Sequence, residues 1–491
     1  MAIAIDAIPD NLRVPGAYIE IDQTGAFKGL PGMPSRILVI GQRLATGTVL
    51  AGVPTPVLDE RAAEAAFGRG SMLHLMIRAL KANNNFTECW AVALDDDGAA
   101  AAATGSLTFA GSPTQSGTVN LMIAGQRVRV AAIAGASAAD IATLAEAAIN
   151  TATDLPVTAN VAGGTPTVVD LTARNKGLAG NGIDLRHSYY QGEALPAGLT
   201  LTIDTMADGT ANPVITPAID AVADEWFTDW AMPYTDPANL IALETELDNR
   251  FGPLVMMDGH AYLAATDTHA NLTTLGNSRN SPHRPILGLY GSPSWAPAIA
   301  SALCGVTAFY ARQDPAEPFQ TLELKGVLPP LMADRFDLAE RNLLLHDGIS
   351  TVRVDDGGAV RIERLITGYQ TNSAGAEDPS FLDMNTMKTV SYIRYAVRAR
   401  IAQKFPRYKL APDGTLFAAG QRVVTPKIIR AELISLFRQL ENIGLVHDLN
   451  QFIKDLIVEI DPNDPNRVNA LIPPNLVNQL RVFAGRVAFL L

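Results

Sequence analysis

The strongest candidate for catalysis is a short serine turn, Gly291 to Pro297, which lies between an apolar run and a helical pattern. Subtilisin-like proteases place their nucleophile in a small-residue turn that opens a helix, so Ser292 or Ser294 would attack an acyl group, supported by Asp258 and His260. A proline lies inside the turn, however, no His-Gly element is present, and Ser-Pro is an ordinary helix opening. We therefore expect no catalytic residue, and a serine hydrolase is kept as the alternative hypothesis.

Residues that bind metal ions or phosphate show no spacing typical of such sites. The seven histidines are dispersed and form no His-x-x-x-His pair. The acidic run 95–97 lacks the alternating spacing and the closing Glu of a calcium loop, so it reads as a solvated turn. No Gly-rich loop precedes Lys-Ser or Lys-Thr, which argues against nucleotide hydrolysis. The sequence predicts no metal, no cofactor and no enzymatic activity.

A basic run without acidic residues lies between Met384 and Pro412. Ile393, Val397 and Ile401 recur at helical spacing, so the run is expected to form an amphipathic helix. Like charges at i, i+4 repel each other, and an acidic partner would stabilise this face, although a merely solvated face is the alternative. The seven basic residues are Lys388, Arg394, Arg398, Arg400, Lys404, Arg407 and Lys409.

Bulk composition limits the classes of partner. The 491 residues carry a net charge of −12, which argues against nucleic acid or an anionic membrane as the main partner. The two cysteines, Cys89 and Cys304, lie in apolar runs and indicate core positions rather than a disulfide framework. The long apolar stretch 287–311 is broken by glycines and prolines, so we expect a buried α/β segment and no membrane insertion.

The order of the predicted elements indicates a split α/β domain. Residues 36–94 read as strand, helix and strand, with Ser71 as N-cap of the helix, which is typical of a βαβ unit and a parallel sheet. An Ala/Gly/Thr/Ser-rich region of short strands follows to about residue 209 and is interpreted as an inserted, mostly β domain on the surface. The α/β pattern then resumes, with a helix expected over 219–230 and a strand over 254–257.

Beyond Gly348 the pattern changes to α+β. A hairpin is expected over 351–363, where four Asp and Gly residues separate two apolar runs. Further on, Thr425 and Gly444 bracket a strongly amphipathic helix, and a strand is expected over 456–460.

Both ends of the chain read as strands without a hairpin partner nearby, over 17–22 and 480–489. A strand with unpaired N–H and C=O groups promotes aggregation unless it pairs with another sheet. That sheet can belong to a second copy of the chain. The sequence therefore predicts strand exchange between copies. The apolar residues assigned to these arms are Tyr18, Ile19, Ile21, Val482, Phe483, Val487 and Phe489.

Four segments of the sequence resemble one protein family. The segments 13–22, 37–41, 66–73 and 399–410, the last followed by Asp413-Gly414, are similar to the tail sheath protein of contractile-tailed phages of the Mu-like type. The resemblance spans most of the chain and is least specific in the inserted region. It implies a non-enzymatic structural subunit of a contractile tail sheath that polymerises helically around the tail tube and contracts to drive the tube through the host envelope.

The resemblance also implies a domain plan, an α/β multidomain fold with a subtilisin-like, non-catalytic α/β domain. Arms at the two ends would join a neighbour's C-terminal sheet, and the basic helix with Lys388, Arg394, Arg398, Arg400 and Lys404 would face the tail tube. The expected parts are an N-terminal arm 1–22, the split α/β domain 23–94 and 211–348, the inserted β domain 95–210, an α+β assembly domain 349–470 and a C-terminal arm 471–491.

The implied partners are further copies of the chain, the tail tube protein, and the baseplate and tail terminator proteins. The implied location is the virion tail, after assembly in the host cytoplasm. A headless contractile injection particle is an alternative to an infectious phage. A secreted adhesin or surface-layer subunit would also use strand exchange, but residues 1–9 lack the charged and apolar regions of a secretory signal.

Overall fold

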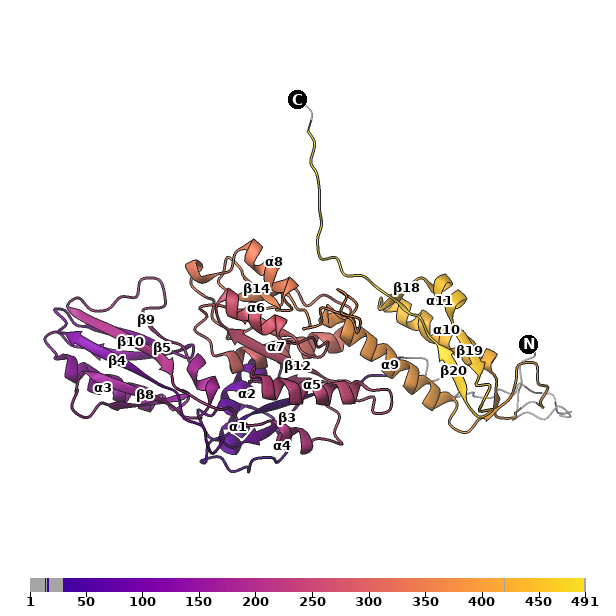
Figure 1. The fold of residues 1–491 in the computed structure, drawn as a ribbon, viewed down its shortest axis with the longest axis horizontal. Helices are drawn as coiled ribbons and strands as arrows, with labels where there is room; N and C mark the ends of the chain where they lie inside the picture. The colour runs from indigo at the N-terminus through magenta and orange to yellow at the C-terminus, as the bar shows by residue number, and fades with distance from the viewer. Residues whose placement is uncertain (1–13, 15, 17–29, 419, 490–491) are drawn as a thin grey trace. The chain divides into compact units, whose positions relative to one another are not determined.

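In the computed structural model, the residues described are 14, 16, 30–418 and 420–489. The chain divides into two compact units, Pro34–Met387 and Met1–Met33 with Lys388–Leu491 (Figure 1). Each unit is described by itself.

A six-stranded sheet organises the first unit, in the order β13-β12-β11-β1-β3-β2. All neighbours are parallel except β2, which runs antiparallel to β3. Ile37–Ile40 are completely buried, because a parallel strand covered on both faces is apolar throughout its length. The strands are β1 Arg36–Gln42, β2 Thr55–Pro56, β3 Glu88–Leu94, β11 Asp229–Ala231, β12 His260–Thr266 and β13 Ile286–Leu289.

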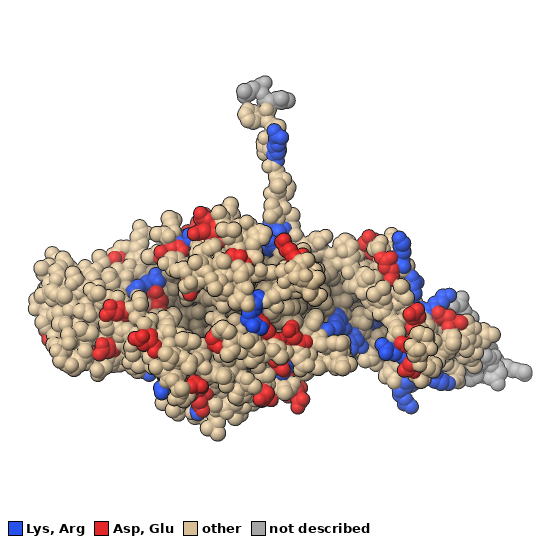
Figure 2. Space-filling view, in the orientation of Figure 1, with Lys and Arg blue, Asp and Glu red and all other residues tan. Residues whose placement is uncertain are grey.

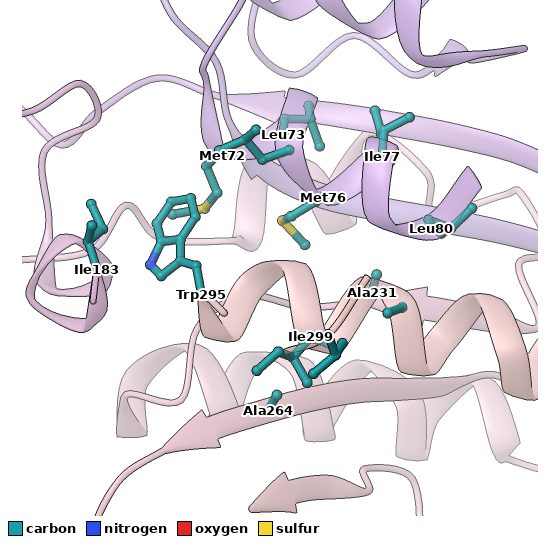
Figure 3. Packing of buried hydrophobic residues seen from close by; sticks show 14 of the residues in the cluster. Met72, Leu73, Met76, Ile77, Leu80, Ile183, Ala231, Ala264, Trp295 and Ile299 are labelled. Atoms are coloured by element: carbon teal, nitrogen blue, oxygen red, sulfur yellow. The ribbon is translucent and has the colours of Figure 1, made fainter. Parts of the chain in front are cut away.

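Helices α2 and α7 meet against this sheet in the largest part of the core. Ser71 caps α2 as predicted, since its side chain accepts a hydrogen bond from the His74 N–H. Figure 3 shows Met72 of α2 beside Trp295, which precedes α7, and Ile299 of α7 directed toward Ala264 of β12. The helices of this region are α1 Glu60–Phe67, α2 Met72–Asn83, α4 Thr216–Asp220, α5 Pro237–Phe251, α6 His269–Asn277, α7 Ala296–Gln313 and α8 Leu338–His346.

Two expected elements differ in the structure. No strand forms over 254–257, where Met256 has a positive φ of 54°, and the paired strand β12 starts at His260 instead. The helix expected over 219–230 ends at Asp220, and the later residues lead into β11. Pairing of Asp229–Ala231 between β1 and β12 overrides the helical pattern, because the sheet satisfies the backbone of these buried residues.

The inserted region is an antiparallel β structure with one helix, as its strand-like runs predicted. Its two sheets have the orders β10-β4-β8-β7 and β6-β5-β9. Helix α3 begins with a capping box between Ser137 and Asp140 and buries Ile141 and Ile149. The elements are β4 Thr104–Gly111, β5 Gly117–Ile123, β6 Gln126–Ala132, α3 Ala138–Thr151, β7 Val157–Val161, β8 Val168–Ala173, β9 Leu185–His187 and β10 Leu199–Ala207.

A buried polar junction fixes the inserted region to the α/β sheet. The Asp96 carboxylate accepts hydrogen bonds from Gln42 Nε2 at 2.6 Å, from Asn175 Nδ2 at 3.2 Å and from the Lys176 N–H at 3.0 Å. The indole of Trp295 donates to the Ala179 carbonyl at 2.9 Å. Residues 95–97 were expected to be a solvated turn. Asp96 instead links the inserted region to the α/β sheet through these hydrogen bonds.

The hairpin β14 Thr351–Val354 and β15 Val360–Arg364 forms as predicted, but it belongs to the α/β unit. Ser350 extends the large sheet, because its N–H donates to the Ile286 carbonyl and its carbonyl accepts from the Gly288 N–H. The second unit therefore starts at Lys388, later than the position 349 expected from the sequence.

The C-terminal unit contains three helices and several two-stranded sheets among the described residues. Helix α10 has the predicted limits, with Thr425 before it and Gly444 in a left-handed conformation after it, although Asp413 rather than Thr425 accepts from the Lys427 N–H. The elements are α9 Met384–Lys404, β16 Lys409–Leu410, β17 Val423–Val424, α10 Pro426–Asn442, β18 Val446–His447, α11 Leu449–Asp455, β19 Ile457–Ile460, β20 Val468–Leu471 and β21 Asn475–Leu476.

Candidate assembly surfaces

The basic helix α9 is joined to α10 by an ion cluster. Arg400 Nη1 and Lys404 Nζ lie 2.9 Å and 2.8 Å from the two carboxylate oxygens of Glu432, and Arg400 Nη2 donates to Gln439 Oε1 at 2.5 Å. Burial raises the pKa of Glu432, but the hydrogen bonds from Lys404 and Arg400 outweigh it, and the net shift is downward. The cluster holds the two helices together.

The five residues expected to face a tube therefore differ in exposure. Lys388 and Arg400 are buried, with 7% and 5% of their surfaces exposed. Arg398 and Lys404 are exposed, whereas Arg394 is half-buried, and burial followed by the nearby Arg398 charge lowers the pKa of Arg394. The sequence pattern missed the pairing with Glu432, because this residue lies on another helix 28 positions beyond Lys404.

Exposed basic residues continue after α9 into the loop that leads to α10. Residues 388–491 contain 15 Lys and Arg against 8 Asp and Glu, although the whole chain has a charge of −12. Figure 2 shows several Lys and Arg side chains close together over this unit. The exposed basic residues that we name the basic surface are Arg398, Lys404, Arg407, Lys409, Arg422 and Lys427.

Residues 480–489 of the C-terminal arm, which were expected to be a strand, form none within the described chain, whereas Asn475–Leu476 earlier in the arm pair with β18. The four predicted apolar residues of the arm are all exposed: Val482 by 80%, Phe483 by 87%, Val487 by 92% and Phe489 by 78%. Exposure of so many large apolar side chains in one segment is typical of a surface that a partner covers. The N-terminal residues Tyr18, Ile19 and Ile21 lie outside the described residues.

Two small sheets of the C-terminal unit offer strand edges. β18 pairs antiparallel with β21, and β19 pairs antiparallel with β20. Within the described residues each sheet has only two strands, and such a pair is marginal unless further strands or helices cover it. Ile457 and Leu471, which face each other in the second pair, are 51% and 60% exposed.

The serine turn is used for local structure. Ser292 Oγ donates to the Leu328 carbonyl at 2.7 Å, and Ser294 Oγ accepts from the Leu328 N–H at 2.8 Å. Both serines are buried, with 4% and 6% of their surfaces exposed. Their hydroxyls thus tie the start of α7 to the loop at Leu328, which leaves neither oriented as a nucleophile.

The predicted supporting groups lie at the other end of the sheet. His260 opens β12 and Asp258 precedes it, whereas the serines follow the carboxyl end of β13. The two strands are parallel, with Thr266 opposite Leu289. His260 is therefore six residues, or about 20 Å, from the carboxyl end of β12, which is the end of the sheet where the serines lie. The structure therefore does not bring the residues of the hydrolase hypothesis together.

The described residues show no metal site and no membrane-spanning helix. They contain no group of three or more His, Cys, Asp or Glu side chains placed to hold a metal ion. Within the same part of the chain, none of the helices has both the length and the apolar character needed to span a bilayer.

Two family models match the chain. The phage tail sheath protein central domain matches residues 208–368, and the phage tail sheath C-terminal domain matches residues 376–489. Among solved structures, the sheath tail proteins of Desulfitobacterium hafniense and Listeria innocua are similar at 14% and 11% identity, each with a TM-score of 0.47. The alignments cover 94% and 93% of this chain and 100% and 94% of those chains.

One curated relative matches throughout its length. The Mu-like prophage FluMu tail sheath protein of Haemophilus influenzae is 45% identical over 491 residues, which is 100% of both chains. Full-length identity at this level, together with both family domains, shows that the chain belongs to the phage tail sheath family as a Mu-like contractile tail sheath protein.

Proposed function

We propose that copies of this chain polymerise helically around a tail tube, linked by strand exchange through their arms. The observation that carries the proposal is the C-terminal arm, whose four large apolar side chains are 78–92% exposed. An added strand gains main-chain hydrogen bonds along its length and buries alternate side chains. The two-stranded sheets β18–β21 and β19–β20 are the proposed receivers.

The basic surface is the proposed contact with an acidic tail tube. Arg398, Arg407 and Lys409 are exposed, and the segment 384–412 contains no Asp or Glu. Charge complementarity of this kind fixes register and favours encounter, and it weakens with salt. Arg400 and Lys404 act in this proposal by holding α9 on α10 through Glu432.

Contraction is proposed to draw on free energy stored during assembly. The sequence contains no phosphate-binding loop that would couple contraction to nucleotide hydrolysis. Strand exchange through terminal arms lets rigid units rotate and slide while the main-chain links persist. During contraction, all contacts between α/β units are replaced together. The contacts of the contracted state are lower in free energy than those of the extended state.

Finer parts of the plan are also proposals. We take the α/β domain, 34–94 with 211–387, to be a non-catalytic subtilisin-like fold and 95–210 to be a surface domain. Residues 388–470 are the proposed assembly domain between the arms 1–22 and 471–491. The baseplate and tail terminator would be the partners at the two ends of the sheath, which assembles in the host cytoplasm. The sheath of a headless contractile injection particle is the second candidate, because an identical subunit would serve there.

Truncation tests the strand-exchange proposal. Negative-stain electron microscopy of the full-length chain at increasing concentration should show hollow tubes. Deletion of residues 480–491 or 1–16 should leave a folded particle, with unchanged circular dichroism, that forms no tubes. Tubes at normal yield from either truncated chain would contradict strand exchange. Replacement of Leu416 by Ser, an exposed apolar residue outside the arms, serves as the control for loss of apolar surface.

A further inference from the structure

The six-stranded sheet carries an exposed apolar feature at each of its two opposite edges. At the β2 edge, Leu50, Val53 and Leu58 are 68%, 46% and 81% exposed. Beyond the β13 edge, Met332 and Leu338 are 82% and 76% exposed. Figure 1 shows α8 and β14 on one side of the α/β body and α1 with β3 on the other.

The feature beyond the β13 edge contains a pocket. β13 and β14 pair only where Leu287 meets Ser350, and farther along a pocket of about 190 Å³ opens between the two strands and the loop before α8. This is several times the volume that one water molecule occupies in the liquid, about 30 Å³. Leu289, Phe336, Val352 and Val354 supply apolar lining. Three arginines, Arg335, Arg341 and Arg353, outnumber the one carboxylate of the lining, Asp334.

The feature at the β2 edge is a protruding side chain. Pro54 and Pro56 flank Thr55 in β2, and prolines on an edge strand prevent pairing with a further strand. A partner at this edge must therefore bind side chains. Leu58, two residues beyond Pro56, is the most exposed apolar side chain of this edge and is followed by the exposed carboxylates of Asp59 and Glu60.

We infer that Leu58 of one copy inserts into the β13–β14 pocket of a second copy. The two features differ and lie at opposite edges of one sheet, so a contact between them is heterologous. Each copy then still presents one free feature to a further copy, and the contact can repeat along an assembly. Charge supports the same pairing, because carboxylates follow Leu58 and arginines line the pocket. Arg341 is already paired with Glu363 at 2.8 Å, and Arg335 Nε donates to the Pro330 carbonyl at 3.2 Å. The exposed Arg353 is therefore the arginine proposed to meet Glu60, whose carboxylate lies 3.9 Å from Arg78 Nη1 within its own chain.

This inference rests on the proposed helical assembly and adds a contact between α/β units to the strand exchange of the arms. A buried apolar side chain at the centre of a charged rim is the arrangement of an energetic hot spot. The contact forms in whichever state of the sheath, extended or contracted, brings two sheet edges together.

Disulfide trapping tests the contact directly, because the native Cys89 and Cys304 are both buried. Chains with Leu58→Cys and chains with Val354→Cys are mixed, assembled and oxidised. The mixture should give a disulfide-linked dimer, and neither variant alone should do so. Leu58→Cys mixed with Leu254→Cys, whose leucine is 93% exposed elsewhere, is the matched control and should remain monomeric on a denaturing gel.

The assembled sheath is the sample: tubes of the purified chain, or tails from cells that make both variants if the purified chain forms no tubes. A second measurement uses charge exchange. Glu60→Arg or Arg353→Glu should each raise the concentration needed for assembly at least tenfold, and the double variant should restore it. Intact sheaths without a mixed dimer in both the extended and the contracted state would overturn the inference, and would leave the sheath function standing.

Discussion

At the residue scale, Glu432 joins the two long helices α9 and α10 of the C-terminal unit. Its carboxylate forms ion pairs with Arg400 and Lys404, and only 6% of the Arg400 side chain is exposed. Removal of a carboxylate from a nearly buried arginine leaves an uncompensated charge, and this costs more than the pair contributes. The ion cluster thereby explains why Arg400, which was predicted to face outward, is buried.

Glu432→Gln should lower the free energy of unfolding by about 1–3 kcal/mol at pH 7. The folded-state pKa of Glu432 lies below its ordinary value, so its stabilisation is complete above the unfolded pKa of about 4.3 and is lost as the pH falls through the folded pKa. The difference between variant and native chain should therefore shrink at acidic pH in urea unfolding followed by circular dichroism. Glu459→Gln, at an exposed position of β19, is the control; an equal effect of both substitutions would contradict the role of the cluster.

At the scale of elements, the inserted β region is a self-contained addition to the α/β sheet. Ala101 and Thr210 form an antiparallel bridge, so the two ends of the insertion lie about 5 Å apart. The remaining contacts include the hydrogen bond from Trp295 to Ala179 and the polar junction at Asp96. A chain that lacks the insertion loses these contacts but keeps every strand of the six-stranded sheet.

Replacement of residues 102–209 by a short Gly-Ser linker should give a folded chain with a lower Tm, because Trp295 and its neighbours become exposed. Thermal unfolding followed by tryptophan fluorescence would show both the lower Tm and a red-shifted emission. Arms and basic surface are unchanged in this variant, so it should still form tubes. Loss of the cooperative transition would show that the insertion is required for folding.

At the scale of the whole molecule, charge is unevenly divided along the chain. Residues 388–491 have a net charge of +7, and the rest of the chain accounts for the acidic total. Such an asymmetry lets one part bind an acidic partner while the rest of the subunit repels it. The proposed contact with an acidic partner is therefore expected on the C-terminal unit.

Reversal of three charges on the basic surface, Arg398→Glu with Arg407→Glu and Lys409→Glu, should abolish binding to tail tubes in a co-sedimentation assay at moderate salt. Tube formation by the sheath itself should persist, since the arms are unchanged. Reversal of Arg438, Lys454 and Arg467, which are equally exposed in the same unit, makes the same change in net charge and should leave binding intact. Equal loss in both variants would show that net charge rather than this surface is recognised.

The sequence by itself determined the elements whose signal is local. The α2 cap at Ser71, the limits of α10, the parallel β1 and β3 and the β-rich insertion all follow from the residue pattern of each element and the order of the elements along the chain. The apolar side chains of the C-terminal arm are exposed in the structure, and their role in strand exchange stays a prediction. The full-length similarity to a known tail sheath protein confirmed the family that four short segments indicated.

Only the tertiary structure decided which of these residues meet. It separated Ser292 from His260, because His260 begins one strand, Ser292 follows the end of a parallel neighbour, and these two positions lie at opposite ends of the strands. It turned Arg400 inward to Glu432, and it replaced a predicted helix by β11, because buried backbone and buried charge take their partners from distant segments. Local patterns carry no information on such partners, since the free energy that selects them arises only when the chain is packed.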